Sequence, residues 1–304
     1  MSPDRGSRAA IFWSFAAIYV LWGSTYLAIR VMVESFPPFL AGGSRFLAAG
    51  GLLYGWARWR GAPAPPRQLW SQATLFGALF FLGGNGGVSW ASTRLPSGLT
   101  ALLAATSPLF TAVFESARDR WRTPPLRVGI GIVGGLAGVG LLVAPGKFIG
   151  GAHADLAGAL VLTLAAASWA AGSVTSHAKP LQVSPVLATA MNMLAGGVLM
   201  SIAGLLLGEG GRLTSEILTL PVLGAWLYLI VFGSLIGFSA FTYLLRVSTP
   251  QKVSTSAFVN PLVAVALGWL VLDEVITPRI LVAAGIIIGA VVLIRARSEE
   301  PGEP

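Results

Sequence analysis

Few residues of this sequence could do chemistry, and they are scattered along the chain. The chain has no cysteine and two histidines, and His153 and His177 lie apart from each other and from any acidic cluster. The sequence therefore offers no thiol nucleophile and no cluster of ligands for a metal site. No nucleophile lies beside a base, and no pair of carboxylates lies deep in an apolar stretch. We expect neither an enzyme nor a bound metal or cofactor.

Two polar residues in apolar surroundings could bind a ligand instead. Asn85 lies at the centre of FLGGNGGVSW, residues 81–90, where its amide is costly to leave unpaired. It either faces a cavity, which we favour, or clamps two helices. Arg45 is the one basic residue well inside an apolar stretch. Its side chain either extends to the outer membrane surface, which its short distance from Pro38 slightly favours, or holds a substrate carboxylate through two hydrogen bonds.

The elements that must position these residues are membrane helices. Of the 304 residues, 55% are hydrophobic and 11% charged, and the mean hydropathy is +0.76, whereas soluble domains carry roughly 25% charged residues. The formal net charge of +8 comes from short basic clusters, without the basic stripe and interleaved aromatics of a nucleic-acid binder. We expect a multi-pass protein of a cell membrane, such as a bacterial inner membrane, whose basic loops face lipid headgroups.

Ten apolar segments approach the length of about 20 residues that a helix needs to cross the hydrocarbon. They cover residues 9–29, 38–58, 69–92, 97–117, 126–144, 155–177, 185–207, 219–245, 252–272 and 279–296. Short junctions rich in Pro, Gly and charge separate them. Most Lys and Arg residues lie at the two termini and in the even-numbered loops, so both termini are predicted to be cytoplasmic. Residues 298–304 form a polar tail.

The two halves of the chain repeat one another. At a single ungapped offset Trp22 aligns with Trp169 and Pro38 with Pro185, and further matches follow in the same order. Similar composition explains shared Ala and Leu, but it explains the Trp and Pro pairs less well. Each copy has five segments, an odd number, so the second copy enters the membrane from the opposite face. We expect inverted five-helix repeats over residues 1–148 and 149–297, an architecture found mainly in transporters.

Several short motifs, in this order, resemble the drug/metabolite transporter superfamily. They are Trp-Gly-Ser at residues 22–24, Ser107-Pro108 and Asn260-Pro261 in segments four and nine, the LDE of residues 272–274, and the GxxxG pairs Gly131/Gly135 and Gly285/Gly289. The chain is similar to the ten-helix EamA-type members, particularly bacterial aromatic amino-acid exporters. One departure is that Arg120-Trp121 stands where the second half has Asp273-Glu274. The glycine pairs are expected to let segments five and ten approach closely, within a monomer or across a homodimer.

A substrate site between inverted repeats is expected to be lined by matching faces of matching helices. That rule gives the candidate cavity residues Trp22, Tyr26, Phe81, Asn85, Ser89, Ser107, Trp169, Ser173, Ser234, Phe238, Thr242 and Asn260. It also gives the candidate hinge residues Gly83, Gly84, Gly86, Gly87, Pro108 and Pro261, which bend helices or free carbonyls. For the two Trp residues, packing is as good an explanation as lining. For the hydroxyl residues taken singly, bonding within the helix or to a neighbour is the favoured role.

The resemblance implies export of amino acids, aromatic ones among them, whereas composition alone indicates only a small amphipathic solute. No Asp or Glu lies deep in a segment, so we predict uncoupled export by alternating access, with residues 1–148 rocking against residues 149–297. A proton-coupled antiporter that uses Glu115, Asp155 or Glu274 is the alternative. A channel, with GGNGG as its selectivity element, is a second alternative.

Overall fold

The computed structural model of the chain describes residues 8–118, 126–143, 155–247 and 256–295. These residues form helices and no strands, which confirms the predicted all-α class. Five helices are long and apolar enough to cross a membrane by length and composition: Arg8–Met32, Ser97–Arg118, Leu156–Ala178, Pro185–Leu206 and Leu220–Phe241. The break between Ala104 and Ser107 lies inside the second of these.

Helices occupy each of the ten predicted segments to within a few residues. In the first half they are α1 (Arg8–Met32), α2 (Pro38–Trp59), α3 (Arg67–Gly77), η1 (Ala78–Gly86), α4 (Gly87–Ala91), α5 (Ser97–Ala104), α6 (Ser107–Arg118) and α7 (Leu126–Val143). In the second half they are α8 (Leu156–Ala178), α9 (Pro185–Leu206), η2 (Glu209–Arg212), η3 (Ser215–Leu218), α10 (Leu220–Tyr228), η4 (Leu229–Ile236), α11 (Gly237–Val247), α13 (Ser256–Leu272) and α14 (Pro278–Arg295).

Proline and short polar residues set the helix starts. Pro38 and Pro185 each stand at the first position of their helix, where the missing N–H would have no partner in any case. The Ser184 hydroxyl accepts from the Leu187 amide at 3.3 Å, and the Asp155 carboxylate accepts from the Gly158 amide at 2.6 Å. These caps satisfy amides that the first helical turn leaves free.

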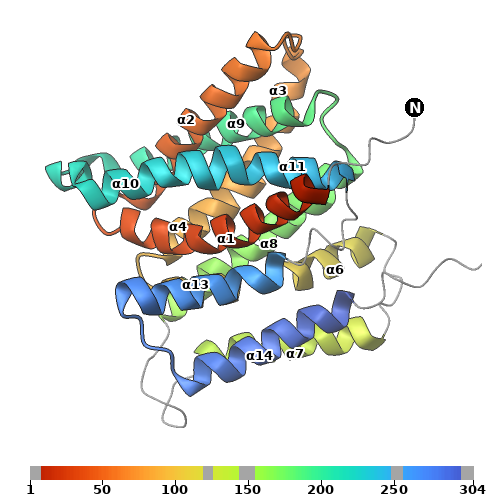
Figure 1. The fold of residues 1–304 in the computed structure, drawn as a ribbon, viewed down its shortest axis with the longest axis vertical. Helices are drawn as coiled ribbons and strands as arrows, with labels where there is room; N and C mark the ends of the chain where they lie inside the picture. The colour runs from red at the N-terminus through yellow and green to blue at the C-terminus, as the bar shows by residue number, and fades with distance from the viewer. Residues whose placement is uncertain (1–7, 119–125, 144–154, 248–255, 296–304) are drawn as a thin grey trace, which may run out of the picture.

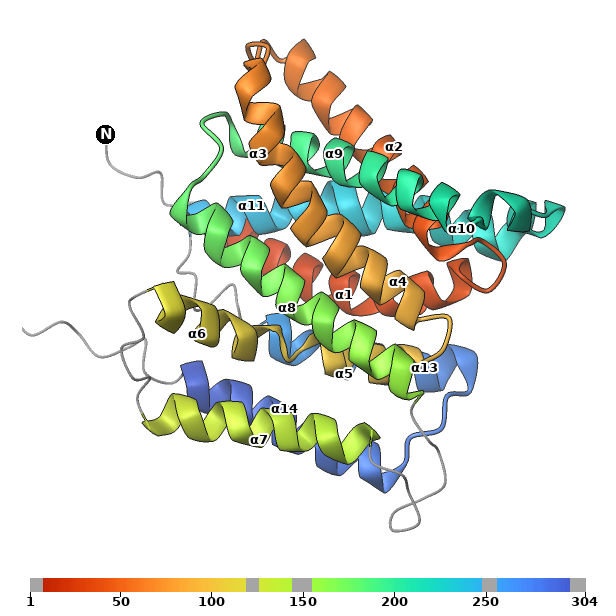
Figure 2. The same cartoon turned by 180° about the vertical axis from the view of Figure 1, so that it is seen from behind.

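The helices pack mainly across the two halves of the chain. α1 lies against α13 and against α10 and α11, while α8 lies against η1, α4 and α6. α2 packs on α9, and α9 also packs on α3. Figure 2 shows α8 running beside the α3 to α4 stretch on one side and beside α6 on the other. Each half therefore supplies neighbours to the other, and the halves interdigitate.

α7 and α14 form a pair at one end of the bundle (Figure 1). The close approach uses Gly138, where an added Cβ would lie 2.7 Å from the Ile287 side chain. Gly135 instead faces Leu109 of α6, and Gly285 and Gly289 have open space around them. The prediction that segments five and ten pack together is confirmed. Within the monomer Gly285 and Gly289 do not provide that contact, and the alternative that they pack across a homodimer stays a prediction.

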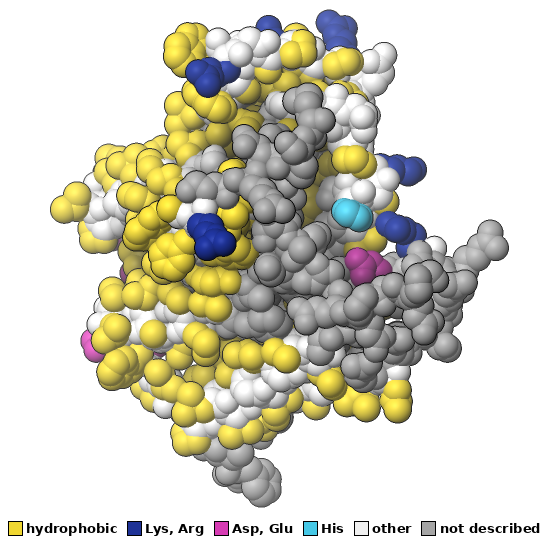
Figure 3. Space-filling view, turned by 45° about the vertical axis from the view of Figure 1, so that its right-hand side comes forward, with side chains coloured by type: hydrophobic (Ala, Val, Ile, Leu, Met, Phe, Trp, Pro, Cys, Tyr) yellow, Lys and Arg dark blue, Asp and Glu magenta, His cyan; other side chains and the backbone are white. Residues whose placement is uncertain are grey.

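Hydrophobic side chains cover most of the surface that Figure 3 shows outside the grey residues. Large apolar residues such as Phe12, Trp13 and Leu206 are exposed in the structure. An apolar surface of this extent would be insoluble in water and suits contact with lipid tails.

Candidate functional site

Arg45 lies buried in the bundle, on α2. The residue is 4% exposed, and its Nε donates to the Ser234 hydroxyl of η4 at 3.2 Å. The guanidinium carbon lies 4.5 Å from the centroid of the Phe46 ring. The interpretation that Arg45 extends to the membrane surface is therefore wrong, because the side chain turns inward, to a neighbouring helix.

Arg45 has no carboxylate partner in the described part of the chain. The ion pair found there joins Arg94 and Asp155, at 3.2 Å and close to solvent. A buried charge without a counter-charge costs several kcal/mol. A charged residue buried inside a membrane protein is commonly part of a functional site.

A row of aromatic rings extends from Arg45 across the bundle. Phe46 contacts Phe81, with 4.5 Å between ring centroids, and Phe81 lies 6.3 Å from Phe238. Phe238 in turn lies 5.3 Å from Trp22. The row, which we call the aromatic row, joins α2, η1, α11 and α1. It brings together three candidate residues that the repeat predicted, Trp22, Phe81 and Phe238.

The GGNGG stretch is helical, and its backbone is wound as a π-helix. η1 covers Ala78–Gly86, and η4 covers Leu229–Ile236 in the matching part of the second half. π-helical turns are rare and occur frequently at functional sites. The Asn85 amide donates to the Phe80 carbonyl at 3.0 Å, within the same helix. In this structure the Asn85 nitrogen is thus used locally and clamps no second helix.

Each half of the chain presents a tryptophan to the π-helix of the other half. Trp22 Nε1 donates to the Gly233 carbonyl of η4 at 3.2 Å. Trp169 contacts the Phe80 ring of η1, with 5.0 Å between centroids. Beside it, Ser168 Oγ donates to the Leu79 carbonyl at 2.8 Å. Both Trp residues thus have packing partners, and both touch the irregular part of a helix.

The candidate hinge glycines lie where other residues come close. A Cβ on Gly83 would lie 2.2 Å from Ser168 Oγ, and one on Gly84 would lie 3.2 Å from the Trp169 ring. Gly87 faces Ala165 in the same way, at 2.6 Å, and Gly86 faces the Phe39 ring at 3.0 Å. These glycines therefore allow α8 and Phe39 to approach η1 and α4, whether or not the segment also bends.

The two candidate prolines differ in their surroundings. Pro108 is the second residue of α6, just after the break that follows Ala104. Pro261 lies inside α13, which continues through it. Ser107 begins α6, and the Thr111 hydroxyl donates back to its carbonyl at 3.1 Å.

The remaining candidates make local or packing contacts. The Asn260 side chain faces the Ile18 and Tyr19 carbonyls of α1, and its amide, turned so that the nitrogen is on that side, would donate to them at 3.2 Å and link α13 to α1. Ser173 Oγ donates to the Trp169 carbonyl one turn earlier. Ser89 is buried near Gly42, and Tyr26 is half-buried on α1. The side chain of Thr242 lies outside the described residues.

Asn192 is the residue of the second half that matches Arg45. Its side-chain oxygen is buried and, within the described residues, accepts no hydrogen bond. The two positions therefore differ in kind, because one offers donors and the other an acceptor.

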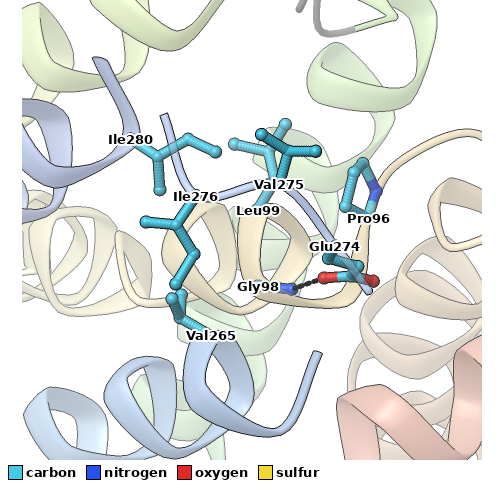
Figure 4. Close-up of a pocket in the computed structure, with 8 residues that line it drawn as sticks. All are labelled: Pro96, Gly98, Leu99, Val265, Glu274, Val275, Ile276 and Ile280. Atoms are coloured by element: carbon cyan, nitrogen blue, oxygen red, sulfur yellow. Dashed lines mark hydrogen bonds between the residues drawn. The ribbon is translucent and has the colours of Figure 1, made fainter. Parts of the chain in front are cut away.

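Acidic side chains near the helix starts have structural roles. Glu274 accepts from the backbone and hydroxyl of Ser97 and from the Gly98 amide, beside a small cavity of about 20 Å³ (Figure 4). Glu209, which the sequence did not single out, accepts from the Phe39 and Leu40 amides at 3.3 and 2.9 Å. The one feature of the sequence that could have pointed to Glu209 is that it is a single acidic residue among glycines. The described residues contain no group of His, Cys, Asp or Glu that could hold a metal.

Comparisons with known proteins give a consistent result. The EamA-like transporter family matches residues 8–144 and 156–296. The "Uncharacterized inner membrane transporter YedA" of Escherichia coli strain K12 is 39% identical over 294 residues, covering 93% of this chain and 90% of that protein. The "Probable amino-acid metabolite efflux pump" of Salmonella typhimurium is 26% identical over 286 residues, 89% of each chain. A crystal structure matches with a TM-score of 0.64 at 21% identity, over 97% of this chain and 100% of its own, which is a likeness of fold.

Proposed function

This chain belongs to the EamA-like transporter family, as a multi-pass inner-membrane protein of the drug/metabolite type, and we propose that it exports small amphipathic metabolites, amino acids and aromatic ones among them. The observation that carries the proposal is the aromatic row beside the buried Arg45. Apolar rings with a few fixed polar groups suit a small solute with an apolar side group. The name of the Salmonella typhimurium relative supports amino acids as the class.

The proposed architecture has ten membrane spans in two inverted repeats, over residues 1–148 and 149–297, with both termini cytoplasmic. Two observations support the duplication. The family matches the chain twice, once in each half. The contacts also exchange between halves: α1 against η4 corresponds to α8 against η1, and α2 against η4 corresponds to α9 against η1. Such an exchange is what a pseudo-two-fold axis between repeats produces.

The moving bodies of an alternating-access cycle need not follow the chain halves. Rocking of residues 1–148 against residues 149–297 would break the packing of α1 on α13 and of α8 on η1. A division that puts α1 and α2 with α10, α11 and α13, and puts the α3 to α6 stretch with α8 and α9, keeps these contacts but breaks the packing of α2 on α9. Because packed helices move together, the contacts favour neither division.

We propose that export is not coupled to protons. Asp155 and Glu274 both serve as caps, with N–H groups bonded to their carboxylates, and Glu115 is exposed near the end of α6. A proton carrier needs to gain and lose its proton as the site changes access. Uptake driven into proteoliposomes by a pH gradient alone would contradict uncoupled export.

The function can be tested by counterflow of labelled amino acids in proteoliposomes. A carrier gives saturable uptake that an internal unlabelled amino acid accelerates, whereas linear flux without that acceleration indicates a channel. Asn85→Ala and Trp169→Ala are expected to change transport, while Trp59→Ala, on a side chain that is 80% exposed, is the matched control. If no amino acid gives counterflow, the proposed function is wrong. If both variants transport every substrate as wild type does, the proposed cavity is wrong.

A further inference from the structure

Most of the hydrogen-bonding capacity of Arg45 is unused by the described residues. A guanidinium carries five N–H donors, and among the described residues the hydrogen bond that Arg45 donates runs from Nε to the Ser234 hydroxyl. The Nη2 end lies beside Gly233, where an added Cβ would be 3.4 Å away. A larger residue at Gly233 would therefore crowd the free end of the guanidinium.

The free end of Arg45 suits a carboxylate. Two parallel N–H groups of a guanidinium match the two oxygens of a carboxylate, and the charge strengthens both hydrogen bonds. A ligand carboxylate would also supply the counter-charge that no described residue provides for this buried cation. A cationic solute without a carboxylate would meet repulsion instead.

The surroundings of Arg45 restrict the rest of the ligand. Phe46 lies over the guanidinium, and Phe81 and Phe238 follow it in the aromatic row. The other buried charged residues in the described ranges, Glu209 and Arg279, belong to other helices and loops. One positive charge among rings favours a monoanionic head with an apolar or aromatic group over a phosphate, which generally needs several donors and cations.

We propose that Arg45 binds the carboxylate of the transported solute, that Ser234 is the positioning residue that holds the guanidinium, and that the substrates are therefore monocarboxylates with an apolar or aromatic group. This inference rests on the proposed function and narrows it. The corresponding Asn192 is a neutral amide whose side-chain oxygen has no partner among the described residues, so it cannot supply the positive charge with which Arg45 would pair a carboxylate.

The decisive experiment compares each amino acid with its amide, which keeps the side group and the amine but lacks the carboxylate. Counterflow of labelled phenylalanine and leucine is measured in proteoliposomes, with unlabelled amino acids and their amides as internal or competing solutes. The proteins are wild type, Arg45→Gln, Arg45→Lys, Ser234→Ala and the exposed control Arg94→Gln. Size-exclusion and thermal unfolding in detergent establish which variants are folded.

Wild type is expected to accept the amino acids and to reject their amides. Arg45→Gln should reduce transport of the carboxylates by about tenfold to a hundredfold, the ratio that loss of charge-assisted hydrogen bonds produces. Arg45→Lys should recover part of it, because lysine keeps the charge without the fork. Ser234→Ala should raise KM and leave the maximal rate near that of wild type.

Two outcomes would overturn the inference while the proposed function stands. One is equal acceptance of an amino acid and its amide by wild type, which needs no variant and so does not depend on the folding of Arg45→Gln. The other is wild-type transport by a folded Arg45→Gln protein. Failure of wild type to transport any amino acid would instead overturn the proposed function, and the inference with it.

Discussion

Glu274 and Ser97 are joined twice, once through the backbone and once through the side chain. Glu274 Oε1 accepts from the Ser97 amide at 2.6 Å, and Oε2 accepts from the Ser97 hydroxyl at 3.0 Å. Ser97 is the first residue of α5, so the carboxylate lies at the positive end of that helix. The link connects the end of the α13 stretch to the start of α5.

Removal of this carboxylate is expected to destabilise the protein without changing transport coupling. Glu274→Gln keeps the shape of the side chain but loses the charge, so the free energy of unfolding should fall by about 1–3 kcal/mol, the range for hydrogen bonds to charged groups. Thermal unfolding in detergent measures the change. Glu216→Gln, on an exposed side chain of η3, is the control and should unfold as wild type does. Loss of pH-dependent transport in Glu274→Gln, with stability unchanged, would contradict the structural role.

The LDE signature shows what the sequence could and could not reveal about this link. The three letters span the end of α13 at Leu272, and Asp273 adopts a positive φ of 52°, which Asp tolerates better than most residues. The partner of Glu274 is 177 residues away, and no local pattern connects the two. The sequence therefore identified the motif as a family marker but not as a helix cap.

Gly83 is expected to tolerate no side chain while Ser168 faces it. A Cβ there would lie 2.2 Å from Ser168 Oγ and 3.0 Å from its Cβ, so Gly83→Ala should push Ser168 away from the Leu79 carbonyl. We expect a loss of about 1–3 kcal/mol, typical of overpacking, in thermal unfolding.

Two further variants distinguish crowding from helix propensity at this position. Ser168→Gly in the Gly83→Ala protein removes the clashing atoms and should recover part of the stability. Gly51→Ala, at an exposed position of α2 with open space around it, should instead stabilise by up to about 1 kcal/mol. An equal loss in Gly83→Ala and in the double variant would show that the contact with Ser168 is not the cause.

The positions of the helices could be predicted from sequence because length, hydropathy and proline act locally. Segments such as 38–58 and 185–207 begin at a proline and are followed within a few residues by glycine and a charged residue, and α2 and α9 match them closely. The π-helical winding of η1 and η4 could not be predicted in this way. Glycine indicated a soft backbone around Asn85, but the extra residue per turn depends on what packs against the helix, and those residues come from the other half of the chain.

The direction of the Arg45 side chain is the clearest feature for which the sequence allowed two alternatives. Its depth of two helical turns from Pro38 is compatible with a side chain that extends to the headgroups or one that turns inward. In the structure the side chain turns inward, because Ser234, far along the chain, places a buried hydroxyl 3.2 Å from Arg45 Nε. The repeat pointed to Ser234 as a candidate but did not pair it with Arg45.

Asn85 is expected to stabilise η1 through its bond to the Phe80 carbonyl. Asn85→Ala should lower the free energy of unfolding by about 1 kcal/mol, the usual net worth of such a bond. Asn85→Asp should lower it further, because a carboxylate cannot donate and its charge would lie within the bundle. Asn192→Ala is the matched control, since its side-chain oxygen has no partner among the described residues, and its loss should be smaller. Thermal unfolding of the four proteins gives the order, and equal stability of Asn85→Ala and wild type would show that the bond contributes nothing.

Asp155 should make the stability of the fold depend on pH, and its contacts determine the direction of that dependence. The Gly158 amide at 2.6 Å, and then Arg94 at 3.2 Å, lower the pKa of the Asp155 carboxyl below its usual value. A folded-state pKa below the unfolded one means that the carboxylate stabilises the fold above the unfolded pKa, about 3.9, and that this contribution is lost as the pH falls through the folded pKa.

Asp155→Asn should therefore unfold at a lower temperature than wild type at pH 7, and the gap should narrow below about pH 4. Arg94→Gln should show a smaller gap at pH 7, because the pair is partly exposed and the Gly158 bond remains. A gap between Asp155→Asn and wild type that stays constant from pH 7 to pH 3 would mean that the charge on Asp155 does not stabilise the fold.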